Sequence, residues 1–253
     1  MLVLLTRAPE ESKRTAARLA QDGHEAVLSP VIEMVPTGAE WPSGVIDGVL
    51  ATSARGFELL SVSPEWPLPE ARRLFPLLLV GERTREAALE RGFEGPLLIA
   101  PDAKTLAPLI MSRFPEPRRF VYLAGRDRKP GLEEALVEAG HTISLVEVYS
   151  AQPADTLTSE ALAAAASGRL SVVLHYSHRS AEIFVSLARQ AGLDFSRINH
   201  VCISQDAAAP LLAAGIHAVL VAKSQDEQAM LAIVNALSVL PEAPLGRGAP
   251  LGA

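Results

Sequence analysis

The stretch LATSARGFELL (residues 50–60) ends an apolar run with two hydroxyl residues and an arginine, after which a helical period begins. Nearly the same phrase returns 124 residues later as LHYSHRSAEIF (residues 174–184). This register superposes three pairs of polar residues: Ser53 on Ser177, Arg55 on Arg179, and Glu58 on Glu182. A buried run that gives way to a polar turn and then to a helix is the repeating element of α/β proteins.

The same alternation continues along the whole chain. LVLL (2–5) precedes EESKRTAARLAQ (10–21), and FVYLAG (120–125) precedes GLEEALVEAG (131–140). Strand, short loop and helix repeated in this order predict parallel sheets that are covered by helices on both faces. The predicted fold class is therefore α/β.

A second pair of segments supports an internal repeat. DGHEAVLSPVIEMVP (22–36) matches AGHTISLVEVYSAQP (139–153), with His24 over His141 and Pro36 over Pro153. The repeat predicts two similar α/β lobes, which spacing alone would divide once, near residue 117. We expect a ligand site between the lobes, at the carboxyl ends of their strands.

Composition limits the function classes. The chain has 253 residues, a net charge of −6 and a single cysteine, Cys202. The negative charge argues against nucleic acid as a partner, and no apolar run reaches the roughly 18 to 20 residues that span a membrane. One cysteine excludes an internal disulfide and fits a reducing cytoplasm. The opening residues MLVLLTR lack the features of a signal peptide and are expected to form a buried strand.

Basic residues gather where the predicted strands end. Eight of the 23 lysines and arginines fall in these loops: Arg7, Arg55, Arg83, Arg85, Arg126, Arg128, Lys129 and Arg179. Hydroxyl residues stand beside them. Arginine presents a planar fork that suits carboxylate or phosphate, so the pattern favours an anionic ligand. The alternative is that each arginine is an ordinary surface residue and each hydroxyl a helix cap.

Common catalytic signatures are absent from the sequence, including the glycine-rich nucleotide loops and the G-x-S-x-G elbow. His175 and His178 form an H-x-x-H pair that no second cluster completes as a metal site. Cys202, within VCIS, is expected to be a buried, inert thiol. Tyr149 ends LVEVY, and a phenol can give or accept a proton, although a tyrosine at a strand end is more often a packing residue.

Taken in order, five segments resemble uroporphyrinogen-III synthase. They are LLTRAPEES (4–12), DGVLATSARGFELL (47–60), LLLVGERTREAALERG (77–92), VYLAGRDRKPGLEEALVEAGHTISLVEVYSAQP (121–153) and VVLHYSHRSAEIF (172–184). The likeness runs from residue 2 to about residue 237. No segment is diagnostic alone, and the specificity lies in their order and spacing.

The resemblance implies two crossings between the lobes, near Pro36 and Pro153. Lobe one would comprise residues 1–36 plus 153–240, and lobe two residues 37–152. Both would be flavodoxin-like, with parallel sheets, a two-stranded connection and a cleft between them. Residues 241–253, rich in proline and glycine, are expected to be a disordered tail.

The activity implied by the resemblance is that of a cofactor-free, metal-free lyase. It cyclises the linear tetrapyrrole hydroxymethylbilane to uroporphyrinogen III, with loss of water and inversion of the last ring through a spiro intermediate. The substrate carries eight carboxylates, which would account for the arginines and hydroxyls at the strand ends. A cytoplasmic monomer in haem biosynthesis, with a polycarboxylate tetrapyrrole as its ligand, is the expected setting.

The resemblance also implies site residues. Tyr149 is the candidate proton donor for the departing hydroxyl. The candidate substrate-binding residues are Arg7, Thr52, Ser53, Arg55, Thr84, Arg126, Arg128, Ser177 and Arg179.

One segment departs from the family pattern. Where the family usually has a Gly-x-x-Thr-Ala turn, this chain reads ISQDAAAPLL (203–212). Ser204 replaces the glycine, Ala207 the threonine, and Asp206 adds an acid near a polyanion site. Our hypothesis is that Arg126 and Arg128 compensate with extra positive charge.

Other readings predict different behaviour. A non-catalytic two-lobed protein would bind an anionic ligand without turnover. A cofactor-free racemase would need an acid/base cysteine from each lobe, and the single Cys202 excludes it. A nucleotide-sugar transferase shares the architecture, but the sequence marks no nucleotide site.

Overall fold

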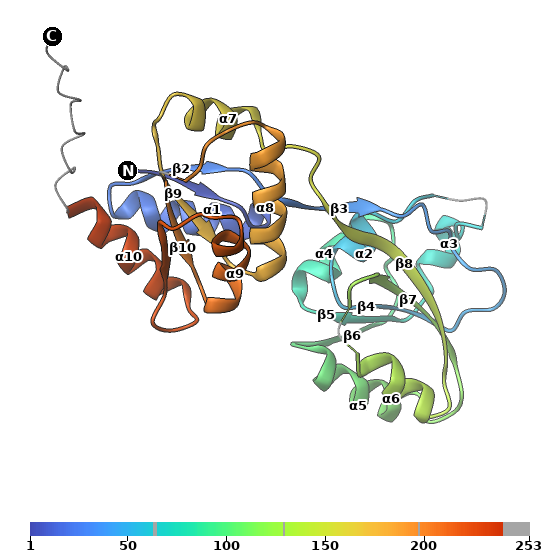
Figure 1. Ribbon diagram of the computed structural model, residues 1–253. Helices are drawn as coiled ribbons and strands as arrows, with labels where there is room; N and C mark the ends of the chain where they lie inside the picture. The colour runs from blue at the N-terminus through green and yellow to red at the C-terminus, as the bar shows by residue number, and fades with distance from the viewer. Residues whose placement is uncertain (63–64, 129, 197, 240–253) are drawn as a thin grey trace, which may run out of the picture. The chain divides into compact units, whose positions relative to one another are not determined.

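The computed structural model describes residues 1–62, 65–128, 130–196 and 198–239 (Figure 1). It divides into two compact units: the first is Met1–Glu33 with the chain from Pro153 onward, and the second is Met34–Gln152. The chain therefore passes between the units twice, within β3 (Ile32–Pro36) and at the end of β8 (Thr142–Pro153). The exact domain limits given above stay a prediction, and the expected tail, residues 241–253, lies outside the described residues.

The sheet of the first unit is parallel throughout, in the order β2-β1-β9-β10-β11. Its strands are β1 (Leu2–Leu5), β2 (Glu25–Leu28), β9 (Leu170–His175), β10 (Asn199–Cys202) and β11 (Val219–Val221). Counted along the chain, this order is 2-1-3-4-5, the order found in flavodoxin.

The sheet of the second unit has the order β3-β8-β7-β4-β5-β6. Beside β3 and β8 its strands are β4 (Gly48–Ala51), β5 (Leu77–Val80), β6 (Leu97–Ala100) and β7 (Arg119–Gly125), and all pairs from β8 to β6 are parallel. The repeat register places β4 over β9 and β8 over β2. When β5, β6 and β7 are matched with β10, β11 and β1, the five parallel strands β8 to β6 have the same order as the first sheet, and β3 is an additional edge strand. The predicted α/β fold with two parallel sheets is confirmed.

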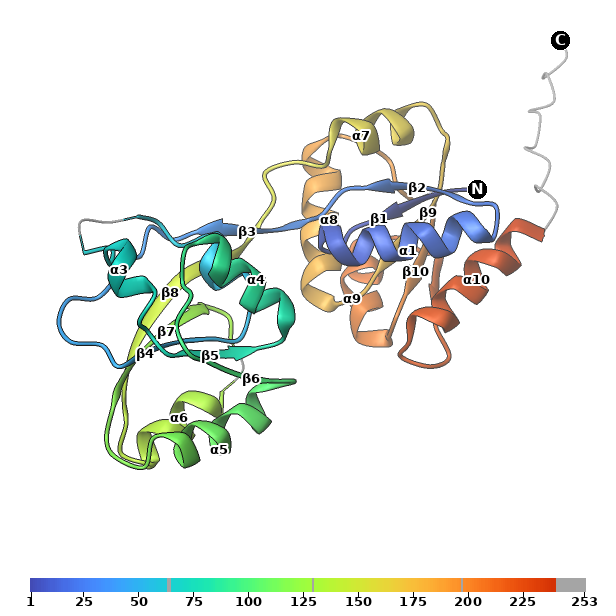
Figure 2. The same ribbon diagram turned by 180° about the vertical axis from the view of Figure 1, so that it is seen from behind.

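Helices cover both faces of each sheet (Figures 1 and 2). In the first unit, α1 (Pro9–Gln21) and α10 (Glu227–Val239) pack on one face; the other carries α7 (Ser159–Ala166), α8 (His178–Gln190) and α9 (Gln205–Ala213). In the second unit, α2 (Arg55–Glu58) and α4 (Glu82–Glu90) lie opposite α5 (Ala103–Arg113) and α6 (Leu132–Glu138). The sequence patterns missed α7 and the short α3 (Pro69–Arg72).

The strands read as continuous apolar runs because they are buried on both sides. In β1, Leu2 and Leu4 join the core beneath α8, whereas Val3 and Leu5 join the core beneath α1. Successive side chains of a strand point to opposite faces, so each strand contributes to two cores. This double burial fixes the register of the sheet.

The repeat extends to a matched pair of buried histidines. The His24 ring lies 3.3 Å from the amino group of Met1 through Nδ1, and Nδ1 of His141 accepts from the backbone N–H of Arg118 at 3.2 Å. Met1 and Arg118 each stand directly before the neighbouring strand, β1 or β7. The predicted correspondence of His24 and His141 therefore has a structural basis.

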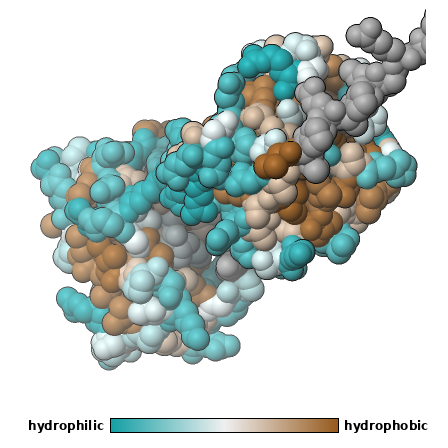
Figure 3. Space-filling model, turned by 90° about the vertical axis from the view of Figure 1, so that its left-hand side faces the viewer, coloured by the Kyte–Doolittle hydropathy of each residue, from teal (hydrophilic) through white to brown (hydrophobic). Residues whose placement is uncertain are grey.

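On the face drawn in Figure 3, hydrophilic residues surround smaller hydrophobic patches. Among the helices in the described part of the chain, none combines the length and apolarity that a membrane crossing requires.

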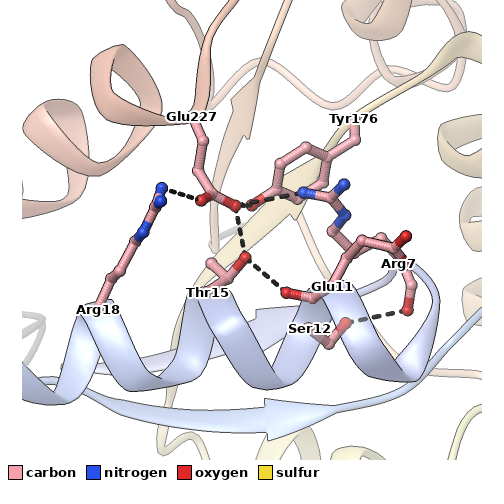
Figure 4. Close-up of polar contacts among 7 residues, drawn as sticks. All are labelled: Arg7, Glu11, Ser12, Thr15, Arg18, Tyr176 and Glu227. Carbon is pink, nitrogen blue, oxygen red and sulfur yellow. Dashed lines mark hydrogen bonds and ion pairs between the residues drawn. The ribbon is translucent and has the colours of Figure 1, made fainter. Parts of the chain in front are cut away.

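Glu227 joins α10 to the rest of the first unit (Figure 4). Its carboxylate accepts hydrogen bonds from four groups, which are the guanidinium groups of Arg7 and Arg18 and the hydroxyls of Thr15 and Tyr176. Its side chain is only 18% exposed, so water can replace few of these donors. The four bonds connect α10 with α1 and with the ends of β1 and β9.

A histidine pair is buried in the same unit. His175 and His200, both fully buried, stack with Nε2 of His175 2.9 Å from Nδ1 of His200. Nε2 of His200 lies 3.1 Å from the Phe195 carbonyl, which can only accept, so the His200 proton is on Nε2. His175 must then donate through Nε2. Both rings are held in the neutral form.

Replacing Glu227 with glutamine should lower the stability of the first unit, because Arg7 and Arg18 lose their shared anion. We expect Glu227→Gln to cost about 1–3 kcal/mol, measured as a shift in the urea midpoint. Glu25→Gln is the matched control, since its ion pair with Arg169 is exposed on both sides and should contribute little. Equal effects of the two substitutions would contradict this account of Glu227.

The histidine pair should make the fold sensitive to acid. Burial lowers the pKa of His200 to about 4, and burial, then the neighbouring His200, lowers that of His175. Above about pH 6.5 both the folded and unfolded states are neutral here; below it the unfolded chain binds protons first, so stability falls toward pH 4. His200 alone accounts for roughly 3 kcal/mol.

The measurement is the free energy of unfolding at pH 7 and pH 5. His200→Gln should flatten the slope, whereas His178→Gln, at an exposed position, should leave it unchanged. Burial of His175 keeps part of the slope in His200→Gln, so a slope as steep as that of the wild type would contradict the assignment.

Candidate functional site

Three strands of the second unit end beside one another. Thr52 directly follows β4, Gly125 ends β7, and Tyr149 of β8 is the register partner of Gly125. Because β4, β7 and β8 are parallel neighbours, their carboxyl ends meet at the same edge of the sheet. Open α/β sheets bind ligands at this edge.

A cavity of about 780 Å³ lies there, between the strand ends and the first turns of α5 and α6. Three residues that carry hydroxyls line it, Thr52, Tyr122 and Tyr149, together with Arg128. The structure thus brings together three of the predicted site residues, Thr52, Arg128 and Tyr149. It adds Tyr122, which the sequence analysis missed.

Gly125 makes room for the Tyr149 ring. A Cβ atom at position 125 would lie 2.6 Å from Cε2 and 3.1 Å from the hydroxyl oxygen of Tyr149. The pairing of β7 with β8 shifts register between Ala124 and Gly125, which re-aims the strand at this point. Tyr149 is half-buried, with its ring lying over the glycine and its side chain lining the cavity.

Tyr122 occupies the floor of the same cavity. Its ring is 3% exposed and packs in the core beneath α5 and α6, while its hydroxyl lies 3.1 Å from Oγ1 of Thr52. Burial raises the pKa of Tyr122, and the hydrogen bond to Thr52 offsets this only in part. The phenol therefore keeps its proton at neutral pH.

Arg126 and Arg128 are held by acidic partners. Nη1 of Arg128 donates to Glu147 at 3.1 Å, Nη2 donates to Glu133 at 3.1 Å, and Arg126 shares the Glu147 carboxylate at 3.3 Å. Burial alone would lower the pKa of Arg128, but the bonds to Glu133 and Glu147 outweigh it and raise that pKa. The four side chains form one network of ion pairs, in which the charges of two cations and two anions cancel.

The remaining charges of the cavity are of both signs, one cation and two anions. Lys104 faces it together with Asp102 and Asp127. Asp102 caps α5 by accepting the N–H of Thr105 at 2.7 Å, and this bond lowers its pKa. The cavity is therefore mixed in charge rather than strongly cationic.

Four predicted residues of the second unit do not line this cavity: Arg126, described above, and Ser53, Arg55 and Thr84. The hydroxyl of Ser53 accepts from the N–H of Arg55 at the start of α2. Arg55 is half-buried. Thr84, on α4, is 3% exposed, so its hydroxyl is enclosed in the protein.

The predicted residues of the first unit lie at the ends of its own strands. Ser177 caps α8 by accepting the N–H of Ser180 at 3.2 Å, and Arg179 is exposed on the first turn of that helix. Arg7 pairs with Glu227 at 3.2 Å and lies 4.3 Å from the centre of the Tyr176 ring. Like Arg128, it is already paired with a carboxylate.

The segment that departs from the family pattern forms the start of α9. Ser204 caps the helix by accepting the N–H of Ala207, and Ala207 is buried. Asp206 lies 3.3 Å from the His178 ring, so its charge has a partner on α8.

The histidine pair and the cysteine that were considered for metal or thiol chemistry lie in surroundings that do not suit these roles. His175 is buried against His200, whereas His178 is exposed beside Asp206. Cys202 is fully buried, and burial raises its pKa to about 12. Within the described ranges, no cluster of three or more His, Cys, Asp or Glu side chains is arranged to hold a metal ion.

Several solved structures are similar to this chain over nearly its whole length, including the following two. Uroporphyrinogen-III synthetase from Helicobacter pylori is 17% identical, with a TM-score of 0.49, over 93% of this chain and 98% of that one. A mutant uroporphyrinogen III synthase from Thermus thermophilus is 18% identical, with a TM-score of 0.46, over 94% and 99%. A comparison with curated proteins gives no match.

The family comparison covers most of the chain. Residues 13–232 match the family model described as uroporphyrinogen-III synthase HemD. This range contains Tyr149 and the whole cavity of the second unit. The chain therefore belongs to the uroporphyrinogen-III synthase HemD family.

Proposed function

We propose that this protein is a uroporphyrinogen-III synthase, a lyase that closes hydroxymethylbilane into uroporphyrinogen III. The observation that carries the proposal is the family match over residues 13–232. The cavity adds chemical support, because the phenol of Tyr149, the hydrogen-bonded Thr52 and Tyr122, and an arginine lie at the same edge of the sheet. These groups suit a polycarboxylate from which a hydroxyl must leave.

The reaction needs one proton delivered and one geometry enforced. Protonation of the hydroxyl of the hydroxymethyl group lets that hydroxyl leave as water when the C–O bond breaks, and loss of a pyrrole N–H proton gives an azafulvene that keeps the methylene carbon. The last ring then attacks through its substituted carbon, forming a spiro intermediate that opens and recloses with that ring inverted. Closure without inversion occurs spontaneously, so the protein mainly has to hold the bilane in one folded conformation.

Tyr149 is the proposed donor of the proton to the departing hydroxyl. Its ring is held over Gly125, where a larger residue would displace it, and its side chain lines the cavity. A positioned general acid contributes about 10²- to 10⁴-fold to a rate. The fixed ring is what such a role requires.

The proposed carboxylate contacts involve an exchange of partners. Glu147 holds both Arg126 and Arg128, and a carboxylate arm of the substrate would compete with it for the same guanidinium donors. Because each arginine has five N–H groups, Arg128 can donate hydrogen bonds to a new carboxylate while it still donates to Glu133. The other predicted binding residues, Arg7, Ser53, Arg55, Thr84, Ser177 and Arg179, remain part of the proposal as candidates.

The oligomeric state, the cellular location and the absence of a cofactor or nucleic-acid partner are also part of the proposal. We expect a monomer that acts in the cytoplasm without a cofactor and without nucleic acid. The support is the net charge of −6 and the single cysteine, which is buried.

The test is an isomer assay. Hydroxymethylbilane is generated in place, the purified protein is added, the products are oxidised, and the type III and type I isomers are separated by chromatography. A large excess of type III supports the proposal. Type I alone, formed at the spontaneous rate, would overturn it; saturable substrate binding without turnover would instead indicate the non-catalytic binding protein.

Tyr149→Phe should reduce kcat by about 10²-fold or more and shift the product toward type I, because the ring stays while the proton donor is lost. The same isomer assay measures both effects, and thermal melting checks that the variant is folded. A folded variant with an unchanged kcat would exclude Tyr149 as the acid.

Arg128→Gln should raise KM by about tenfold, since a charge-assisted hydrogen bond to a carboxylate is lost. Arg126→Gln should have a smaller effect, because its side chain is 60% exposed. Glu147→Gln should lower KM, as it removes the competing carboxylate. Arg73→Gln is the control, since its ion pair with Glu94 is exposed and away from the cavity; a KM change equal to that of Arg128→Gln would contradict the assignment.

A further inference from the structure

The Thr52–Tyr122 hydrogen bond gives the cavity a polar group that the proposed mechanism does not use. Tyr122 lies on β7 and Thr52 directly after β4, and their oxygens are 3.1 Å apart. The Tyr122 side chain is 3% exposed, whereas Thr52 is half-buried. Tyr122 is thus enclosed with its hydroxyl within hydrogen-bond distance of Thr52, and Thr52 is the more exposed residue of the two.

Each hydroxyl has one hydrogen to donate. Among the described residues, the bond between the pair is the hydrogen bond recorded for either oxygen. One of the two therefore donates to the other, and the second keeps a free O–H. Which one donates depends on what enters the cavity.

A carboxylate fixes that direction, because it can only accept hydrogen bonds. It would take the hydrogen of Thr52, which faces the cavity, and Thr52 would in turn accept from Tyr122. A phenol is the better donor of the two hydroxyls, and burial raises the pKa of Tyr122, so it remains protonated. Donors in series polarise one another and strengthen the terminal bond.

We propose that Tyr122 is a positioning residue that orients the Thr52 hydroxyl toward one carboxylate arm of the substrate. The inference rests on the proposed function for the identity of that substrate. Arg128 lines the same cavity as Thr52, so the bound arm meets a cation as well as the oriented hydroxyl. Tyr122 itself touches no reacting atom in this role, which separates it from Tyr149.

The location of Tyr122 distinguishes this role from packing alone. Its ring fills the core shared with Leu50, Leu78 and Phe120, and phenylalanine would fill the same space. A ring needed only for packing would therefore tolerate Tyr122→Phe. The hydroxyl matters only if something depends on the bond to Thr52.

The experiment compares Tyr122→Phe, Thr52→Val, Thr52→Ser and the double variant Tyr122→Phe/Thr52→Val. KM and kcat are measured for type III formation, and the Kd of uroporphyrin III is measured by tryptophan fluorescence. We expect Tyr122→Phe to raise KM and Kd by about 3- to 10-fold with kcat within twofold of the wild type. Thr52→Val should raise KM and Kd by at least as much, whereas Thr52→Ser should retain most of the affinity.

The double variant tests the coupling between the two hydroxyls. If Tyr122 acts through Thr52, its loss costs nothing once Thr52 is valine, so the double variant should match Thr52→Val. Additive effects would overturn the proposal, as would an unchanged KM in folded Tyr122→Phe. A lower kcat with unchanged KM would also overturn it, since Tyr122 would then take part in the chemistry.

Two further comparisons cover the cases in which Tyr122→Phe does not fold or the wild type does not form the type III isomer. If Tyr122→Phe does not fold, the serine and valine variants at position 52 decide: a KM raised by valine and restored by serine supports the oriented hydroxyl, and equal values overturn it. If the wild type forms only the type I isomer, the proposed function fails. The Kd of uroporphyrin III then tests Tyr122 separately, and a value unaffected by Tyr122→Phe overturns the inference.

Discussion

The parallel pairing of β4, β7 and β8 is the constraint on which the candidate site depends. Parallel neighbours end at the same edge of a sheet, so residues separated by up to 97 positions, Thr52 and Tyr149, come to line one cavity. The pairing has to be kept in register, and the register is fixed because these strands are buried on both faces. A one-residue slip would turn Tyr122 out of the core beneath α5 and α6 and break its bond to Thr52.

Charge compensation is the second constraint. An acidic chain that places arginines at its strand ends can pair them with its own carboxylates, and it does so for Arg128, Arg126 and Arg7. Sequence position could not reveal this: Glu147 is 19 residues from Arg128, and Glu227 is 220 residues from Arg7. The prediction that the arginines lie at the strand ends was correct. In the structure, however, their partners are carboxylates of the same chain. The proposed anion binding at such positions would be an exchange of carboxylates, in which the cost of releasing Glu147 would offset part of the gain from the new contact.

The sequence was most informative where two independent periodicities agreed. The repeat register and the strand–helix alternation together predicted two parallel sheets, and His24 and His141 marked equivalent places in them. It was less informative for α7, whose run of alanines has only a weak apolar stripe. Tyr122 was missed because a tyrosine inside a buried strand is normally a packing residue. The signal that could have found it is chemical, since a buried phenol needs a hydrogen-bond partner.

The same scaffold position is used differently in the two units. The offset of 124 residues places Thr52 over Tyr176, so a hydroxyl follows the equivalent strand in both. Tyr176 donates to Glu227, whose carboxylate is already shared with Arg7 and Arg18, and burial raises the pKa of that phenol to about 12. This hydroxyl is committed to holding α10 and has no hydrogen left for a ligand. The recorded partner of Thr52 is another hydroxyl rather than an acid, and either of the two can donate, so Thr52 would have a hydrogen for a ligand when Tyr122 is the donor. Repetition of the sheet thus supplied two equivalent strand ends, and the partner of each, carboxylate or phenol, makes one of them structural and leaves the other as the proposed binding position.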